Sequence, residues 1–235
     1  MPWLSHSPKN EVVNRICDRI WLAVVQRTLR PGARLKEEDL AAIFNATRAR
    51  VRQALTLLEQ DGLVSIAPNR GACIAEPDIE DAHDAFATRL QVEQRLITRL
   101  CRKVTPEQVA ALRAHVMRER AAHRDGDGEA MIRLSGEFHM LLAAQAGGDL
   151  LQRILRTLTI RTSLITAMYQ TESVQTCGPD EHARIVDAIA AQDARRAIAE
   201  MAHHLQHLEA ELRLEGDAPP VSGLRAALLG RAEGF

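Results

Sequence analysis

The chain contains 235 residues, of which 46% are hydrophobic, and it carries a formal net charge of −1. This length allows one large domain or two modest ones, and the apolar content is sufficient for a packed core. No apolar stretch is long enough to cross a bilayer, and the N-terminal residues lack a signal-peptide layout, so we expect a cytoplasmic protein with no membrane partner. Aromatic residues make up only 3% of the chain, which favours a mainly α-helical fold.

The charges are distributed unevenly along the chain. Residues 1–76 contain 11 Lys or Arg and 8 Asp or Glu, whereas the remaining residues contain 19 and 23. A basic N-terminal module joined to a mildly acidic body is typical of a nucleic-acid-binding domain connected to a domain with another role.

The N-terminal part predicts three helices followed by a hairpin. Apolar residues recur at helical spacing over residues 11–29, 37–44 and 48–61. Thr47 is placed to cap the third of these helices. Two β-prone runs flank the turn formers at residues 68–71 and indicate a β-hairpin. This order of elements is that of a winged helix-turn-helix, which we assign to residues 1–77.

The rest of the chain predicts a helical bundle. Breaks rich in Gly, Pro and Asp divide it into six helices, over residues 80–103, 106–124, 129–146, 149–170, 180–191 and 193–214. We expect these helices to form an antiparallel six-helix bundle over residues 78–215. The Gly/Pro/Ala-rich tail, residues 216–235, is expected to be poorly ordered, with room for one short helix over residues 223–229.

Residues 29–72 carry the densest motif, LRPGARLKEEDLAAIFNATRARVRQALTLLEQDGLVSIAPNRGA. The segment contains a PG turn, L-x-E-x-x-L-A, a Thr-Arg followed by V-R-x-A-L, L-x-x-x-G-L-V, and a wing ending in Arg-Gly. This run of motifs resembles the GntR family of bacterial transcription regulators. The resemblance implies that the N-terminal domain binds double-stranded DNA.

The start of the third predicted helix carries the candidate DNA contacts. Arg48 and Arg52 are spaced i, i+4 on a polar face, and the resemblance implies that such arginines contact base edges while Thr47 holds a phosphate. Relatives usually have Thr-Pro where this chain has Ala49-Arg50, so we expect Arg50 to supply a different contact. A solvated charged face is the alternative interpretation of the arginines. The predicted DNA-binding residues, including those of the wing, are Thr47, Arg48, Arg50, Arg52, Asn69, Arg70 and Gly71.

Four fragments of the helical part resemble the FCD branch of the same family. The branch has R-x-x-x-E, F-H-x-x-L, E-H-x-x-I and H-L motifs. The matching fragments here are RLQVEQRL at 89–96, FHMLLAAQAGGDLL at 138–151, EHARIVDAIAAQDARRA at 181–197 and MAHHL at 201–205. The resemblance implies a helical domain that binds an effector.

Three histidines of these fragments, His139, His182 and His204, lie on or beside apolar helix faces, so we expect them to point inwards. The resemblance implies that they ligate a divalent metal such as Zn or Ni, which imidazoles suit. Histidines that only fill a core are the alternative. Relatives often have a fourth ligand, an aspartate one turn before His139, where this chain has Ser135. We therefore expect weaker metal binding, or water or effector oxygens in place of that carboxylate.

Two further histidines, His203 and His207, fall away from the apolar seam of the last helix. They form an i, i+4 pair that could chelate a metal adventitiously, but we expect them to be solvent-exposed.

Arg89 lies on a helix face with apolar residues, and a charge in that position needs a partner. One interpretation is an internal pair with Glu93, one turn away. The other, which the resemblance suggests, is that Arg89 and the space beside Ser135 hold a small carboxylate effector next to the metal.

Taken together, the motifs predict a homodimeric transcription regulator, not an enzyme, that binds a palindromic operator and responds to a small organic acid. Two alternatives stay open from the sequence. One is a DNA-binding dimer with neither metal nor effector. The other is a three-histidine metalloenzyme, against which no general base is evident beside the histidines.

Overall fold

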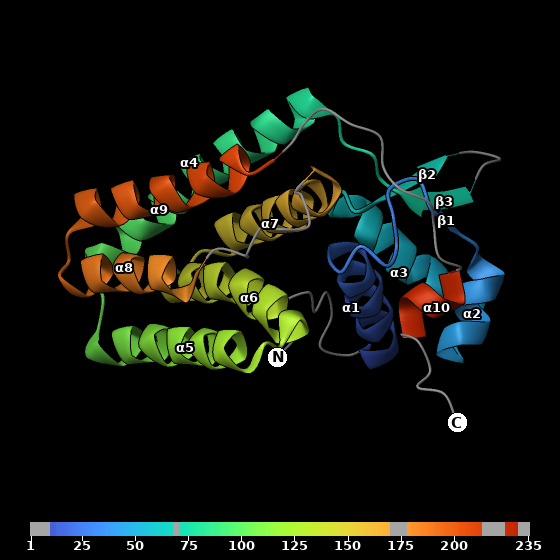
Figure 1. Ribbon diagram of the computed structural model, residues 1–235, viewed down its shortest axis with the longest axis horizontal. Coiled ribbons are helices and arrows are strands. Elements are labelled where there is room, and N and C mark those ends of the chain that lie inside the picture. The colour runs from blue at the N-terminus through green and yellow to red at the C-terminus, as the bar shows by residue number, and fades with distance from the viewer. Residues whose placement is uncertain (1–9, 68–70, 170–177, 213–223, 230–235) are drawn as a thin grey trace. The chain divides into compact units, whose positions relative to one another are not determined.

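The computed structural model describes residues 10–67, 71–169, 178–212 and 224–229. These residues form a mainly helical fold with one small sheet, as predicted (Figure 1). The chain divides into two compact units. The first is drawn from Met1–Asp78, Ile160–Tyr169 and Leu214–Phe235, and the second from Ile79–Thr159 and Gln170–Arg213. No helix among the described residues is both long enough and apolar enough to span a membrane.

The first unit contains the winged helix-turn-helix. Its three helices are α1 (Glu11–Val25), α2 (Glu37–Phe44) and α3 (Arg48–Gln60). The strands β1 (Arg34–Leu35), β2 (Val64–Ala67) and β3 (Gly71–Ile74) form an antiparallel sheet in the order β1-β3-β2. The helix faces that the apolar spacing indicated are buried, with Leu40 of α2 and Val51 and Leu58 of α3 fully inaccessible to solvent.

Helix α1 is shorter than predicted. It ends at Val25, whereas the apolar pattern extended to Leu29. Arg27 adopts a left-handed backbone conformation with φ of 57°, and the N–H of Leu29 donates to the carbonyl of Ala23 at 2.8 Å. The turn still buries Leu29, which is 1% exposed. The apolar periodicity therefore continues beyond the last helical residue because the turn packs into the same core.

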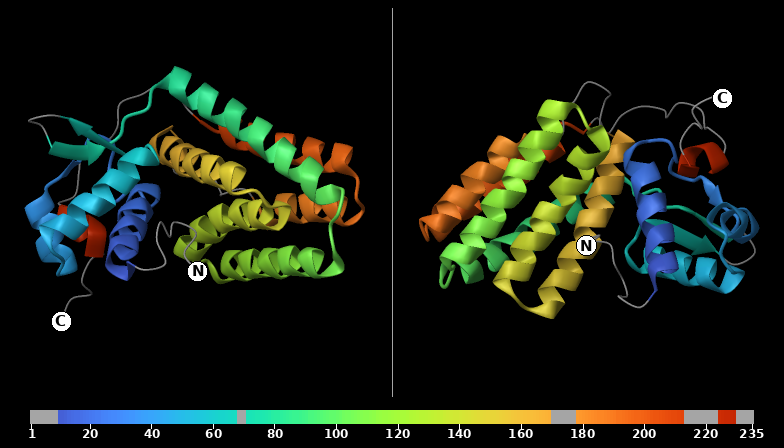
Figure 2. Two further views of the ribbon diagram at one scale, coloured as in Figure 1. Left: turned by 180° about the vertical axis from the view of Figure 1, so that it is seen from behind. Right: turned by 90° about the horizontal axis from the view of Figure 1, so that it is seen from below.

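The second unit is built from the helices that follow. They are α4 (Ile79–Cys101), α5 (Pro106–Asp125), α6 (Gly128–Ala146), α7 (Asp149–Tyr169), α8 (Pro179–Ala190) and α9 (Ala194–Ala210), with Ile160–Tyr169 of α7 assigned to the first unit. Helix α9 packs along α4 and α8, and α5 packs along α6 and α8 (Figures 1 and 2). A core of buried residues from α4, α5, α6, α8 and α9 surrounds Phe138 and Leu142.

Capping residues lie at the start of three of these helices. Thr105 forms a capping box with Gln108 at the start of α5, and Asp127 and Asp193 cap α6 and α9 by accepting from backbone N–H groups. Each cap satisfies N–H groups that have no partner within the helix. The six predicted helices are thus present, and each begins and ends within four residues of the predicted position.

A short C-terminal helix, α10 (Leu224–Leu229), belongs to the first unit and packs against α1 and α2. Arg19 donates two hydrogen bonds to the carbonyl of Leu228, at 2.8 and 3.2 Å, and Thr28 donates to that of Ala227. The expected disorder of the tail concerns residues 216–223 and 230–235, which lie outside the described residues; the short helix expected over 223–229 is present.

Candidate metal centre and DNA-binding helix

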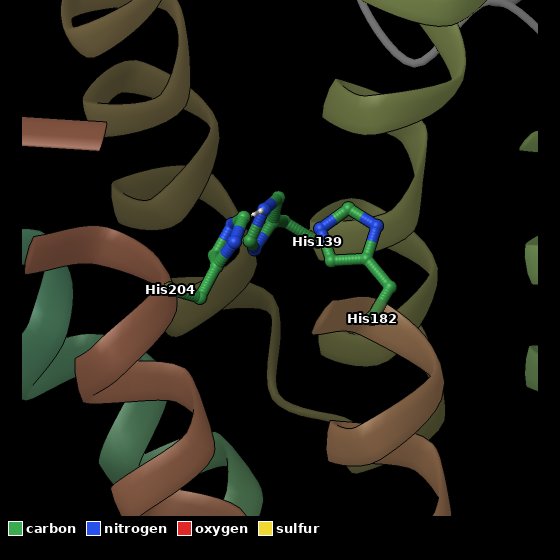
Figure 3. Close-up of side chains that lie close together, drawn as sticks. All are labelled: His139, His182 and His204. Carbon is green, nitrogen blue, oxygen red and sulfur yellow. Dashed lines mark hydrogen bonds between the residues drawn. The ribbon is translucent and has the colours of Figure 1, made fainter. Parts of the chain in front are cut away.

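Three imidazoles converge inside the second unit. His139 lies on α6, His182 on α8 and His204 on α9, and none is more than 1% exposed. One ring nitrogen from each falls within 4.8 Å of the others, and the Nε2 atoms of His139 and His204 are 3.3 Å apart (Figure 3). We call these residues the central histidines. Among the described residues, they form the one group of three or more possible metal ligands whose ligand atoms all lie within 4.8 Å of one another.

Helix packing around Phe138 orients two of these rings. The ring of Phe138, which is fully buried, stacks on that of His182 with centroids 3.9 Å apart and an interplanar angle of 12°. It meets its neighbour His139 edge-on, with centroids 5.4 Å apart. The Phe-His motif of α6 therefore places one aromatic ring against the α8 histidine and the next ring into the cluster.

A carboxylate lies against the Nδ1 atom of every central histidine. The contacts are His139 to Glu93 at 2.8 Å, His182 to Glu119 at 2.8 and 3.0 Å, and His204 to Glu181 at 2.8 Å. A ring that donates its Nδ1–H to a carboxylate keeps the Nε2 lone pair for another partner. Histidines that bind metals in proteins usually have this backing by a carboxylate or carbonyl, which fixes tautomer and ring orientation.

Burial favours the neutral form of two of the central histidines, His139 and His204. Burial lowers the pKa of His139 well below its ordinary value, and the positive charge of Arg89 acts in the same direction. Burial also lowers the pKa of His204 to about 3, although its hydrogen bond to Glu181 opposes the shift. Burial opposes ionisation of Glu181, but its contacts with His204 and His207 outweigh this and lower its pKa to about 2. A metal binds the neutral form of an imidazole, and this is the form that burial favours at His139 and His204.

Arg89 forms the internal ion pair with Glu93 that was one of the two interpretations from the sequence. Its side chain is buried, and its Nε donates to Oε1 of Glu93 at 2.8 Å. The other oxygen of Glu93 accepts from His139. One buried carboxylate therefore connects the arginine to a central histidine. Ser135, one turn before His139 on α6, is partly buried.

The carboxylates of Glu119 and Glu181 are site residues that the sequence analysis missed. Glu181 immediately precedes His182, and its position in the E-H motif was a signal that could have identified it. Glu119 belongs to none of the recognised motifs. Its placement depends on the packing of α5 against α8, which no local pattern encodes.

The predicted DNA-binding helix, α3, begins at a capped turn. The Thr47 side chain accepts from the N–H of Arg50 at 3.4 Å. Arg48 and Arg52 are exposed, and each contacts a glutamate at the start of α2. The pairs are Arg48 with Glu38 at 2.9 Å and Arg52 with Glu37 at 2.9 and 3.0 Å. The sequence analysis did not anticipate these ion pairs.

The remaining predicted contacts lie on the same turn of α3 or on the wing. The side chain of Arg50 is exposed. Asn69 and Arg70 lie outside the described residues. Gly71 begins β3 with a positive φ of 76°, a conformation that favours glycine, and no atom of the described residues beyond its chain neighbours lies within 4 Å of the position that a Cβ would occupy. A backbone or a ligand could therefore approach Gly71 closely.

A winged helix-turn-helix with exposed arginines at the start of its third helix defines a DNA-binding protein, and the helical second unit with its buried polar centre is joined to it in one chain. This combination of a DNA-binding domain and a second helical domain is typical of transcription regulators.

Comparison with known proteins specifies the family. Residues 10–74 match the bacterial regulatory proteins of the gntR family, and residues 84–207 match the FCD domain. The HTH-type transcriptional repressor RspR of Escherichia coli (strain K12) is 25% identical over 211 residues, which cover 88% of this chain and 90% of that protein. The HTH-type transcriptional regulator YdhC of Bacillus subtilis (strain 168) is 25% identical over 186 residues, covering 77% and 81%.

A solved structure shows the same fold. The structure of E. coli McbR/YncC has a TM-score of 0.73 at 20% identity, over 85% of this chain and 96% of that one. With both parts of the chain matched, this protein belongs to the GntR family of bacterial transcription regulators and carries an FCD domain as its C-terminal part.

Proposed function

We propose that this protein is a homodimeric regulator whose operator affinity is modulated by a small organic acid bound near a divalent metal. Residues 1–77 bind one half of a palindromic operator through α3 and the wing, and residues 78–215 bind the effector and dimerise. The observation that supports this proposal is the set of three buried imidazoles, each backed by its own carboxylate.

The donor set fits a first-row divalent metal. A buried cluster of three imidazoles is suited to Zn²⁺ or Ni²⁺. Packing of a hydrophobic core does not by itself require a buried carboxylate beside each ring, whereas orientation of metal ligands does. The residues that hold the metal are His139, His182 and His204. With Ser135 in place of a carboxylate ligand, the set supplies three strong protein ligands, and coordination positions stay available to water or to oxygens of the effector. When bound, the metal supplies a positive charge that attracts an anionic effector.

Arg89 is the proposed anchor of the effector carboxylate. Its guanidinium can form two parallel bonds to a carboxylate, but it now contacts Glu93. An acid that binds Arg89 competes with Glu93, and Glu93 also holds His139. Effector binding and metal binding are therefore expected to be coupled through this shared carboxylate. The effector changes DNA affinity by as much as it prefers one conformational state over the other.

Metal analysis of the purified, untagged protein tests the metal part of the proposal. We expect the central histidines to hold one Zn²⁺ or Ni²⁺ per chain, and His182→Ala to abolish that binding. The test of the regulatory part uses a selected operator fragment and a panel of mono- and dicarboxylic acids, with anisotropy as the readout. If operator affinity responds to neither metal nor acid, the regulatory part of the proposal fails. If the protein also binds no metal, it is a DNA-binding dimer whose central histidines only fill the core.

A further inference from the structure

Two exposed histidines of α9 lie next to the central cluster and share one of its carboxylates. His203 and His207 have 66% and 45% of their side chains exposed, and their ring centroids are 6.3 Å apart. The Nδ1 atoms of both rings face the same oxygen, Oε1 of Glu181, at 3.9 and 2.9 Å respectively. The other oxygen of Glu181 holds His204, a central histidine, at 2.8 Å. Glu181 therefore presents one oxygen inwards and one outwards.

The surroundings of His207 favour a bound cation. Its Nδ1 lies 2.9 Å from Glu181 and its Nε2 lies 3.2 Å from Oε1 of Glu211. A neutral imidazole has one N–H and one lone pair, so it can donate to only one of these carboxylates. The lone pair then faces the other carboxylate and is repelled by it. Either a second proton or a metal ion at that nitrogen relieves the repulsion.

We propose that His203, His207 and Glu181 form a second divalent-metal site, the outer site, at the surface of the second unit. Histidines at i and i+4 on one helix face are a known zinc-binding arrangement, and Glu181 adds a carboxylate oxygen within reach of both rings. In the metal-bound form His207 coordinates through Nδ1 and donates its Nε2–H to Glu211. That is the same histidine–carboxylate backing that the central histidines have.

The ligand class follows from the donors and the local charge. Two imidazoles and one carboxylate favour Zn²⁺ or Ni²⁺ over Mg²⁺ or Ca²⁺, which require mostly oxygen ligands. The guanidinium of Arg184 lies 3.9 Å from Oε1 of Glu181 and opposes cation binding, although its Nε is also bonded to Glu200 at 3.0 Å. Exposure of both histidines and this nearby positive charge make the outer site the weaker of the two. It goes beyond the proposed function and does not depend on occupancy of the central histidines.

Equilibrium dialysis of the full-length, untagged, chelator-treated chain against Zn²⁺, with metal analysis, tests the outer site. We expect two Zn²⁺ per chain at saturation and one in the double variant His203→Ala/His207→Ala. His123→Ala, which removes an exposed histidine of α5, is the matched control and should retain two. His139→Ala should lose the inner metal and keep the outer one. Far-UV circular dichroism checks that each variant is folded.

Two subtler variants separate a metal site from a set of ion pairs. Glu211→Gln removes the backing carboxylate of His207 and should weaken outer binding about 10- to 100-fold, the usual effect of losing such a partner. Arg184→Gln removes the opposing charge and should tighten outer binding.

The outcomes distinguish the two sites. If the wild type binds one Zn²⁺ that His139→Ala abolishes and the double variant retains, the outer site does not exist and the central metal centre stands. If the single Zn²⁺ is lost in the double variant and kept in His139→Ala, the outer site stands and the metal part of the proposed function fails.

Discussion

The two units use pairs of opposite charge in contrasting ways. In the first unit, the side chains of the Arg48–Glu38 pair are 64% and 69% exposed, so water screens the pair and either side chain can contact solvent or another ion instead. In the second unit the Arg89–Glu93 pair is 5% and 0% exposed, and the same carboxylate holds His139. Breaking a surface pair costs little free energy, whereas removing one partner of a buried pair leaves an uncompensated charge. Exposed pairs suit a surface that must exchange partners, and buried pairs suit a site that must stay fixed.

The largest effect should come from removing the buried carboxylate of Glu93. Glu93→Ala leaves the guanidinium of Arg89 buried without its partner, so we expect the free energy of unfolding to fall by about 3–5 kcal/mol. Urea denaturation followed by circular dichroism measures this change. The double variant Arg89→Leu/Glu93→Gln contains no buried charge at this point and should regain at least half of the loss. A loss below about 1 kcal/mol in Glu93→Ala would show that water reaches the pair.

A smaller effect is expected at Glu119, which backs His182. Glu119→Gln keeps the shape of the side chain but removes its charge, so the affinity of the central histidines for Zn²⁺ should fall about 10- to 100-fold. Competition with a chromogenic chelator measures the change. Glu129→Gln, an exposed glutamate at the start of α6, is the matched control and should leave affinity unchanged. Equal affinities for wild type and Glu119→Gln would mean that Glu119 does not orient a ligand.

The sequence predicted the helices and the three central histidines well but missed the partners that give the cluster its chemistry. Apolar spacing identifies which helix face is buried, and the Phe-His, E-H and H-L motifs contain the three imidazoles that the structure brings together. Glu119 could not be identified because it lies 63 residues before His182 in the sequence. Only the packing of α5 against α8 brings the two side chains together. The predicted end of α1 was wrong because apolar spacing detects burial and not helical backbone. Leu29 is buried, but it lies in the turn after the helix.

In the first unit, loss of the N-cap of α3 should lower the free energy of unfolding moderately. Thr47→Ala removes the hydroxyl that accepts from the N–H of Arg50, and N-cap losses of this kind cost about 1 kcal/mol. Thr56→Ala, an exposed position within α3, is the control and should be neutral or slightly stabilising because alanine has the higher helix propensity. Thermal unfolding distinguishes the two, and Thr47→Ser should behave as wild type because serine caps equally well.

The smallest effect on stability is expected at the exposed pairs, where the contrast between the units can be tested most directly. Glu37→Gln/Glu38→Gln breaks the contacts with Arg52 and Arg48, and the free energy of unfolding should change by about 0.5 kcal/mol or less, because both pairs are largely solvated. DNA affinity should nevertheless rise, since two negative charges beside the arginines proposed to contact DNA are removed, and the gain should shrink as salt concentration increases. Anisotropy with an operator fragment at several salt concentrations measures both trends. A large loss of stability, or weaker DNA binding at every salt concentration, would mean that the glutamates hold the arginines in their DNA-binding orientation and that the exposed pairs, like the buried ones, serve to fix structure.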